Sequence, residues 1–335
     1  MPTRGYRQTV PSHVGGCRSR RELHALLGLR RPLPTLPDVV ADQHVEHRDG
    51  VLVRRLTLQV AGDSVPCLLL TPEGSGPWPG VVAIHQHNGE FALGKSEPAG
   101  LAGDRTMAYG DAMARLGAVV LIPDLSGFED RLDDARTGAR AEQLEAFHLL
   151  TLGSTLQARH VEDVALCVSW LSQHPDVTGP IGVIGHSLGG QVAFFAAACD
   201  ERIRAAVVSC GLGTLESFHR AGVLHNPAWY VPGLALAGDS PAVAALVENQ
   251  SVWISAGETD PLFPIQGVRD AVAGFKAGTA ELHVFAGGHN LPPAVSAEAT
   301  AWLLGVLAEQ RAAPGDRSRW VVRRRPEARR RVDLR

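Results

Sequence analysis

The chain has 335 residues, of which 45% are hydrophobic and 20% are charged. An apolar fraction of this size supplies a packed core, which excludes a disordered or fibrous chain. The formal net charge of -3 gives no general attraction to nucleic acid or to an anionic membrane. No apolar run approaches the roughly 18–20 residues that a membrane span needs, so we expect neither a nucleic-acid partner nor a membrane protein.

The N-terminal segment 1–50 is predicted to be an arm that lies on the body of the protein. Residues 20–27 have the composition of a short helix, and three prolines between 32 and 37 then favour an extended chain. The first residues lead into no apolar stretch typical of a secretory signal. The five cysteines are scattered and form no C-x-x-C pair. We therefore expect a reducing cytoplasm, and neither a disulfide framework nor a zinc site.

From residue 51 onward the pattern is that of an α/β protein. Two β-rich runs, 51–60 and 65–71, flank a hairpin signal and predict an antiparallel pair at the edge of the sheet. Short apolar runs then alternate with segments of helical spacing, which predicts a mostly parallel sheet with helices on both faces. The further predicted strands are 80–85, 118–123, 181–185, 205–209, 251–256 and 281–286, and the predicted helices are 107–116, 161–171, 191–198, 268–275 and 294–307.

The chain is predicted to form one domain, at 51–309, between two arms. Two long connections, at about 126–160 and 211–248, are expected to be lid-like insertions, because long connections in a compact domain are often functional. Between residues 311 and 335 there are ten arginines and three acidic residues, so the Arg-rich C-terminal tail at 310–335 balances an acidic body. We expect this tail to be solvated, or to dock on the acidic body or on a neighbouring subunit.

The strongest chemical signal is the sequence Gly185-His186-Ser187-Leu188-Gly189. It follows a predicted buried strand and precedes an apolar helix, which is the context of a nucleophile elbow. The two glycines lack the side chains that would clash in so sharp a turn. We therefore predict that Ser187 is a catalytic nucleophile.

A nucleophilic serine needs a base, and the base needs an orienting acid. After a nucleophile elbow the acid and then the histidine follow in chain order. Asp260 follows the predicted strand 251–256, and His289 follows the predicted strand 281–286. Because the carboxyl ends of parallel strands meet at one edge of a sheet, we expect these side chains to lie beside Ser187.

Several neighbouring residues are alternatives to these. Glu258 is the rival acid, with a solvated loop carboxylate as its alternative reading. His186 is expected to point away from the tip of the elbow. Asp124 ends a strand and either supports the site or caps the following turn, of which we favour the cap.

The tetrahedral intermediate of acyl transfer also needs an oxyanion hole. One donor is expected to be the backbone N–H of Leu188, and the other is expected in the loop after the strand 80–85. His87 is the preferred donor there, with Gln86 second. His85 and His87 form an H-x-H pair, but no Cys or carboxylate nearby in the sequence completes a ligand set. We therefore predict no metal.

These residues resemble those of a known superfamily. The order of the strands and the segments 185–189, 257–261 and Gly288-His289 resemble the α/β-hydrolases, and within them the branch of dienelactone hydrolases and acetyl xylan esterases. The segments specific to this branch are 85–89, 93–98, 122–124, 230–233 and 260–265. The resemblance covers about residues 50–307. It implies an α/β-hydrolase fold and ester-type hydrolysis through an acyl-enzyme on Ser187. Dienelactone hydrolases proper carry cysteine at that position, and relatives often show Pro-Arg where this chain has Asn249-Gln250.

The function that we expect is a serine hydrolase acting on a carboxylic ester, thioester or lactone of a small molecule, without a cofactor. The alternative function is acyl transfer or cyclisation of a natural-product intermediate, catalysed by the same residues. A third hypothesis is a non-catalytic binding module that kept the fold. A second copy of the chain is the macromolecular partner to consider. Aromatic residues near the predicted loops and insertions either line the substrate site or pack the lids onto the core: Phe91, Phe128, Phe147, Trp229 and Tyr230.

Overall fold

The structure is a computed structural model that describes residues 16–33, 35–132 and 137–312. Most of the predicted C-terminal tail, from residue 313 on, lies outside these residues, as does the start of the predicted N-terminal arm. In the described part of the chain, no helix is both long enough and apolar enough to cross a membrane.

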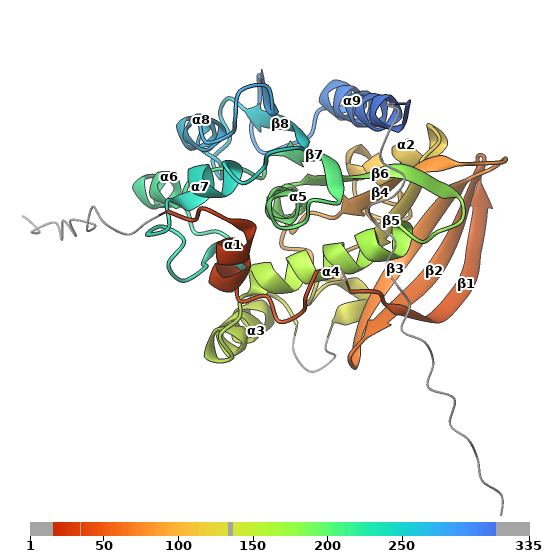
Figure 1. Ribbon diagram of the computed structural model, residues 1–335, viewed down its shortest axis with the longest axis horizontal. Coiled ribbons are helices and arrows are strands. Elements are labelled where there is room, and N and C mark those ends of the chain that lie inside the picture. The colour runs from red at the N-terminus through yellow and green to blue at the C-terminus, as the bar shows by residue number, and fades with distance from the viewer. Residues whose placement is uncertain (1–15, 34, 133–136, 313–335) are drawn as a thin grey trace, which may run out of the picture.

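One sheet runs through the whole molecule (Figure 1). Its strands are β1 (Asp38–Arg48), β2 (Val51–Val60), β3 (Asp63–Pro72), β4 (Trp78–Ile84), β5 (Val119–Pro123), β6 (Val177–His186), β7 (Ile203–Ser209), β8 (Ser251–Gly257) and β9 (Ala280–Phe285). They lie in the order β1-β2-β3-β5-β4-β6-β7-β8-β9. The pairs from β1 to β5 are antiparallel, and every pair from β5 to β9 is parallel. The predicted fold class, with its antiparallel N-terminal edge, is confirmed.

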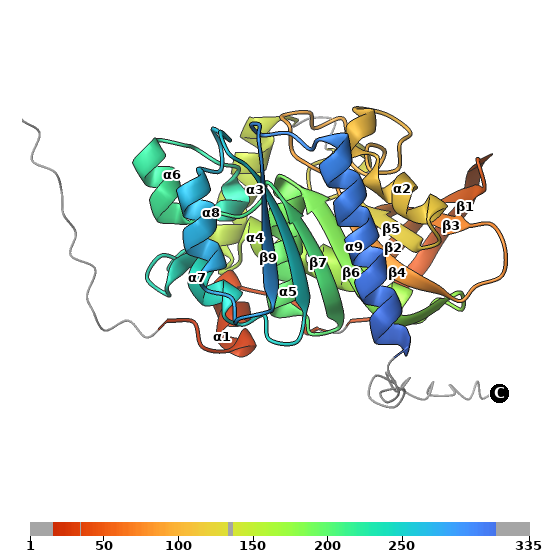
Figure 2. The ribbon, with the colours of Figure 1, turned by 90° about the horizontal axis from the view of Figure 1, so that it is seen from above.

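Helices cover both faces of this sheet. They are α1 (Arg20–Leu27), α2 (Tyr109–Arg115), α3 (Ala139–Thr151), α4 (Leu156–Leu171), α5 (Leu188–Cys199), α6 (Leu215–Ala221), α7 (Asp239–Ala244), α8 (Ile265–Val272) and α9 (Pro293–Ala312), with short 3-10 turns η1 (Arg105–Met107), η2 (Glu129–Arg131) and η3 (Pro227–Trp229). Figure 2 shows α9 crossing one face of the sheet, with α4 and α5 behind the strands.

The core is divided by the sheet into two apolar clusters. Val82 and Ile84 of β4 belong to the cluster under α4 and α5, while Val81 and Ala83 belong to the cluster under α2 and α9. Successive side chains of a strand point to opposite faces, so a strand buried on both faces is apolar at every position. This is why the continuous apolar runs in the sequence predicted these strands correctly.

The prediction of an N-terminal arm at 1–50 is wrong for residues 38–48, which form the edge strand β1. Its side chains are almost all exposed or half-buried, and it is held by its backbone ladder to β2. A strand that buries neither face carries no hydrophobic alternation, which is why the sequence pattern missed it. The predicted short helix is α1, whose Leu23 and Leu27 are buried and which packs on α4 and α5.

The two predicted insertions carry helices of their own. The segment 126–160 contains η2 and α3 and ends in the first turn of α4, and 211–248 contains α6, η3 and α7. Helix α8 begins at Ile265, three residues before the predicted start, directly after Pro264. Helix α5 begins at Leu188, immediately after the predicted nucleophile.

Candidate active site

Ser187 stands at a sharp turn between β6 and α5. Its backbone has a φ of 54° and a ψ of -118°, a conformation that L-residues adopt only when the surroundings impose it. A Cβ on Gly185 would lie 2.2 Å from the carbonyl carbon of Gly189, and a Cβ on Gly189 would lie 2.0 Å from the carbonyl oxygen of Ile84. The sequence predicted that side chains would clash at both glycines, and they would: Gly185 lets the turn close on itself, and Gly189 lets it pack against the end of β4.

His289 lies between Ser187 and Asp260. Its Nε2 is 2.9 Å from Oγ of Ser187, and its Nδ1 is 2.8 Å from Oδ2 of Asp260. These residues follow β6, β8 and β9, which end at the same edge of the sheet. The structure thus brings the three predicted side chains together into one continuous row.

The environment of Asp260 stabilises its ionised form. Burial works to raise its pKa, but hydrogen bonds from the His289 ring and from the N–H groups of Leu262 and Phe263 outweigh burial and hold the pKa below its ordinary value. An ionised carboxylate only accepts hydrogen bonds, so Nδ1 of His289 donates to it. In the neutral ring Nε2 then carries no proton and accepts from the Ser187 hydroxyl. The ring of Phe263 stacks on that of His289 with centroids 5.5 Å apart.

The loop after β4 is held by side-chain hydrogen bonds. Nδ1 of the buried His85 donates to the carbonyl oxygen of Gln86 (2.8 Å), and the N–H of Leu125 donates to its Nε2 (3.0 Å). Burial lowers the pKa of His85 to about 4, so the ring is neutral at pH 7. Because a trans peptide points its C=O and N–H in opposite directions, this bond directs the N–H of His87 away from the His85 ring.

The three predicted oxyanion donors lie at positions with free backbone N–H groups. Leu188 is the first residue of α5, where an N–H has no acceptor within the helix. Neither the N–H of Gln86 nor that of His87 donates to another residue in the described part of the chain. The Gln86 side chain donates to both oxygens of Glu97 (3.2 and 3.1 Å), which anchors the loop further.

The nitrogens of the H-x-H pair contact protein groups. Both nitrogens of His85 are engaged as described above. Nε2 of His87 lies 3.0 Å from Oε2 of Glu142 in α3, and its Nδ1 accepts from the N–H of Gly89. Sequence spacing gave no sign of the Glu142 contact, because the two residues are 55 positions apart.

The alternative residues lie outside the hydrogen-bonded row of Asp260, His289 and Ser187. Glu258 is exposed. His186 is buried with its Nδ1 3.0 Å from Oγ of Ser209, and burial together with the nearby His289 lowers its pKa to about 3. Asp124 does bond the following turn, because its Oδ2 accepts from the N–H of Asp130 (3.1 Å). The sequence did not predict its second contact, in which it is completely buried against the ammonium of Lys95.

Comparison with known proteins identifies the family of this chain. A model of the dienelactone hydrolase family matches residues 65–290. The chain belongs to this family. YtaP of Bacillus subtilis (strain 168), whose name describes it as a hydrolase, is 30% identical over 258 residues, which are 74% of this chain and 83% of YtaP. The protein is thus an α/β-hydrolase of a family that acts on esters or lactones.

Solved esterases share the fold. Acetyl xylan esterase 1 from Thermoanaerobacterium sp. JW/SL YS485 superposes with a TM-score of 0.63 at 15% identity, over 88% of this chain and 95% of that one. A cold-adapted esterase from an Arctic intertidal metagenomic library gives a TM-score of 0.56 at 21% identity, over 80% and 98% of the two chains. At such low identity the likeness concerns the fold alone.

The aromatic residues of this dienelactone hydrolase family member fall into two groups. Phe128 and Trp229 are completely buried, and Phe91 is half-buried and stacks on Phe128 beside the His87 ring. These three pack the loops onto the core. Phe147 and Tyr230 instead are exposed and line an apolar cavity of about 300 Å³ between α3 and the segment 224–230, together with Leu150, Leu156, Leu224 and Pro227.

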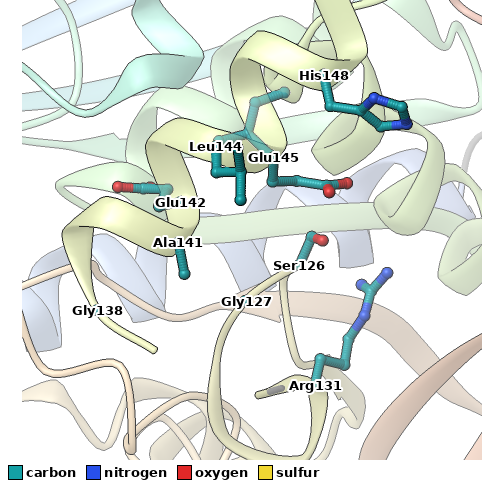
Figure 3. Close-up of a pocket in the computed structure, with 10 residues that line it drawn as sticks. Ser126, Gly127, Arg131, Gly138, Ala141, Glu142, Leu144, Glu145 and His148 are labelled. Carbon is teal, nitrogen blue, oxygen red and sulfur yellow. The ribbon is translucent and has the colours of Figure 1, made fainter. Parts of the chain in front are cut away.

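A second cavity, of about 380 Å³, lies on another side of α3. Figure 3 shows Glu145 and His148 of this helix facing Ser126 and Arg131, while Glu142 is turned away from them. Its lining mixes polar side chains with Ala141, Leu144 and Leu156. Helix α3 therefore lines both a mixed cavity and an apolar one, and through Glu142 it contacts the loop of His87.

Proposed function

We propose that the protein is a serine hydrolase that cleaves a carboxylic ester, thioester or lactone of a small molecule through an acyl-enzyme on Ser187. The observation that carries this proposal is the unbroken hydrogen-bonded row from Asp260 through His289 to Ser187. Membership in a family of ester and lactone hydrolases supports it.

The first half of the reaction forms the acyl-enzyme. Nε2 of His289 takes the hydroxyl proton as Oγ of Ser187 attacks the substrate carbonyl carbon. Asp260 keeps the proton on Nδ1 and stabilises the imidazolium that forms. The protonated Nε2 then donates to the leaving alcohol, thiol or lactone oxygen, and the carbon–heteroatom bond breaks.

The second half returns the enzyme to its starting state. Nε2, again without its proton, activates a water molecule that attacks the acyl carbon, and the free acid leaves. In both halves the negative oxygen of the tetrahedral intermediate is held by the backbone N–H groups of Leu188 and His87, with that of Gln86 as the alternative. The His85 bond that orients the Gln86–His87 peptide supports His87, because such donors act by being held in place before the charge develops.

We assign the apolar cavity beside α3 to the apolar part of the substrate. His225 lines this cavity, its ring lies 4.7 Å from that of Phe263, and Phe263 stacks on His289. The cavity is thus separated from the proposed base by two side chains. Of the aromatic residues that the sequence offered for the substrate site, Phe147 and Tyr230 line this cavity.

The cysteines support the expected cytoplasmic location. All five, Cys17, Cys67, Cys167, Cys199 and Cys210, are free and buried. Free thiols are usual in a reducing compartment.

An activity panel tests the proposal. Wild type, Ser187→Ala and the control Ser172→Ala, whose hydroxyl only bonds the turn before it in α4, are assayed on p-nitrophenyl esters, acyl thioesters and lactones. We expect Ser187→Ala to lower kcat by about 10⁴–10⁶-fold and to lose labelling by a fluorophosphonate probe, with its circular dichroism unchanged. Analysis of the products separates hydrolysis, which gives a free acid, from acyl transfer or cyclisation. A folded wild type that is neither labelled nor active overturns the proposal.

A further inference from the structure

One buried thiol lies beside the row of residues described above and has no part in the proposed reaction. Cys210 directly follows β7, between the strands that carry Ser187 and Asp260. Its Sγ lies 3.7 Å from the carbonyl oxygen of Asn290, the residue after His289. Its backbone has a φ of 43°, so the fold holds a non-glycine residue in a strained conformation here.

The thiol lies close enough to Asp260 and His289 for all three side chains to bind one cation. One ligand atom each of Cys210, Asp260 and His289 lies within 4.8 Å of the others. In a tetrahedral zinc site with bonds of about 2.0–2.3 Å, the ligand atoms are about 3.3–3.7 Å apart. Shifts of at most about 1.5 Å bring the thiol into that range, and the Nδ1–Oδ2 pair, which is now 2.8 Å apart, has to open by about 0.5 Å.

The donor set also selects the kind of cation. A thiolate, an imidazole and a carboxylate together favour a borderline-soft ion such as Zn²⁺, and disfavour Mg²⁺ or Ca²⁺, which prefer oxygen ligands. The other close cluster in the described residues, Asp124 with Glu129 and Asp130, offers only oxygens. There the ammonium of Lys95 already contacts all three carboxylates.

We propose that Cys210, Asp260 and His289 form an inhibitory binding site for Zn²⁺ and ions of similar chemistry. The inhibition rests on the proposed function, while the binding does not. The cation takes the place of the proton between Nδ1 and Oδ2, that proton moves to Nε2, and the thiol releases its proton to solvent. With Nδ1 bound to the metal and Nε2 protonated, His289 has no lone pair left to accept the Ser187 proton.

Binding is tested directly with Co²⁺, whose complexes with thiolates absorb in the near ultraviolet. The protein is freed of metal with a chelator and titrated as wild type, Cys210→Ser and the control Cys17→Ser, which removes a thiol that bonds only Ser19. We expect a thiolate-to-cobalt band in wild type and in Cys17→Ser, and none in Cys210→Ser. Absence of the band from wild type overturns the proposal without the need for any variant.

Inhibition is measured on the same three proteins with a p-nitrophenyl ester and Zn²⁺. We expect Zn²⁺ to inhibit wild type reversibly on addition of a chelator, and the inhibition constant to rise at least about tenfold in Cys210→Ser. Equal inhibition of wild type and Cys210→Ser shows that the metal acts elsewhere and contradicts the proposal. If wild type has no activity, the proposed function fails, while the cobalt band still reports on the site.

Discussion

The Nζ of Lys95 lies 2.6 Å from Oδ2 of Asp124, and both side chains are completely buried. Nζ also lies 2.7 Å from Oε1 of Glu129 and 2.8 Å from Oδ2 of Asp130. Burial works against the ammonium charge, but the three carboxylates outweigh it and hold the pKa of Lys95 above its ordinary value. Lys95 thus joins the loop after β4 to the start of the 126–160 insertion.

Replacing Lys95 by Met is expected to destabilise the fold strongly. It leaves the buried Asp124 without its counter-charge, and breaking a buried pair in this way costs about 3–5 kcal/mol. The free energy of unfolding is measured by urea denaturation at pH 7. The chain offers a matched control, because its second lysine, Lys276, pairs with Glu248 at the surface, with side chains 57% and 48% exposed. Lys276→Met should change stability far less, and equal losses for the two variants would contradict this assignment.

Replacing Asp260 by Asn is expected to lower kcat by about 10⁴-fold with little change in fold. An amide no longer holds the proton on Nδ1 of His289, so Nε2 is not kept free to accept from Ser187. Steady-state kinetics on a p-nitrophenyl ester measures the effect. The control is Glu258→Gln, an exposed carboxylate two residues away. A larger loss for Glu258→Gln than for Asp260→Asn would make Glu258 the acid.

The free energy of unfolding is expected to fall as the pH drops below about 6.5. Burial lowers the pKa of His85 to about 4, of His186 to about 3 and of His225 to about 4. It also lowers that of His160 well below the ordinary value. The unfolded chain then binds protons that the folded protein does not, which destabilises the fold. Asp124 opposes this, since burial raises its pKa to about 6, but the histidines outnumber it.

His160 gives this expectation a single-residue test. Its ring is completely buried, and neither nitrogen has a hydrogen-bond partner in the described part of the chain. His160→Leu should therefore keep stability at pH 7 while reducing the slope of stability against pH by about 1.4 kcal/mol per pH unit near pH 5. Urea denaturation at several pH values measures the slope. An unchanged slope would mean that His160 is not held neutral by the fold.

Replacing Phe147 by Ala is expected to change the preference for acyl chain length. The side chain lines the apolar cavity that we assign to the substrate, and losing apolar contacts of this kind costs about 10–200-fold in kcat/KM. The loss should appear with longer acyl chains and be small with acetate esters. Leu152→Ala serves as control, since Leu152 is exposed just after the same helix. A uniform loss across chain lengths would place the acyl group elsewhere.

Much of the fold could be read from local pattern. Strands buried on both faces are apolar at every residue, and the order of Ser187, Asp260 and His289 behind successive strands predicted where each would lie. The pattern missed features that depend on backbone hydrogen bonds or on contacts between residues far apart in the sequence. Edge strand β1 buries neither face, and the contacts of Lys95 with Asp124 and of His87 with Glu142 join residues 29 and 55 positions apart.

The sequence by itself determined the α/β architecture, the nucleophile elbow and the order of the residues that we propose as catalytic, because each depends on neighbours along the chain. Only the tertiary structure decided which aromatic residues are core and which line a cavity, and which thiol lies beside Asp260. Those distinctions depend on how strands and helices far apart in the sequence pack against one another. Net charge likewise gave no sign that the ammonium of Lys95 is buried against three carboxylates, because that contact forms only in the folded chain.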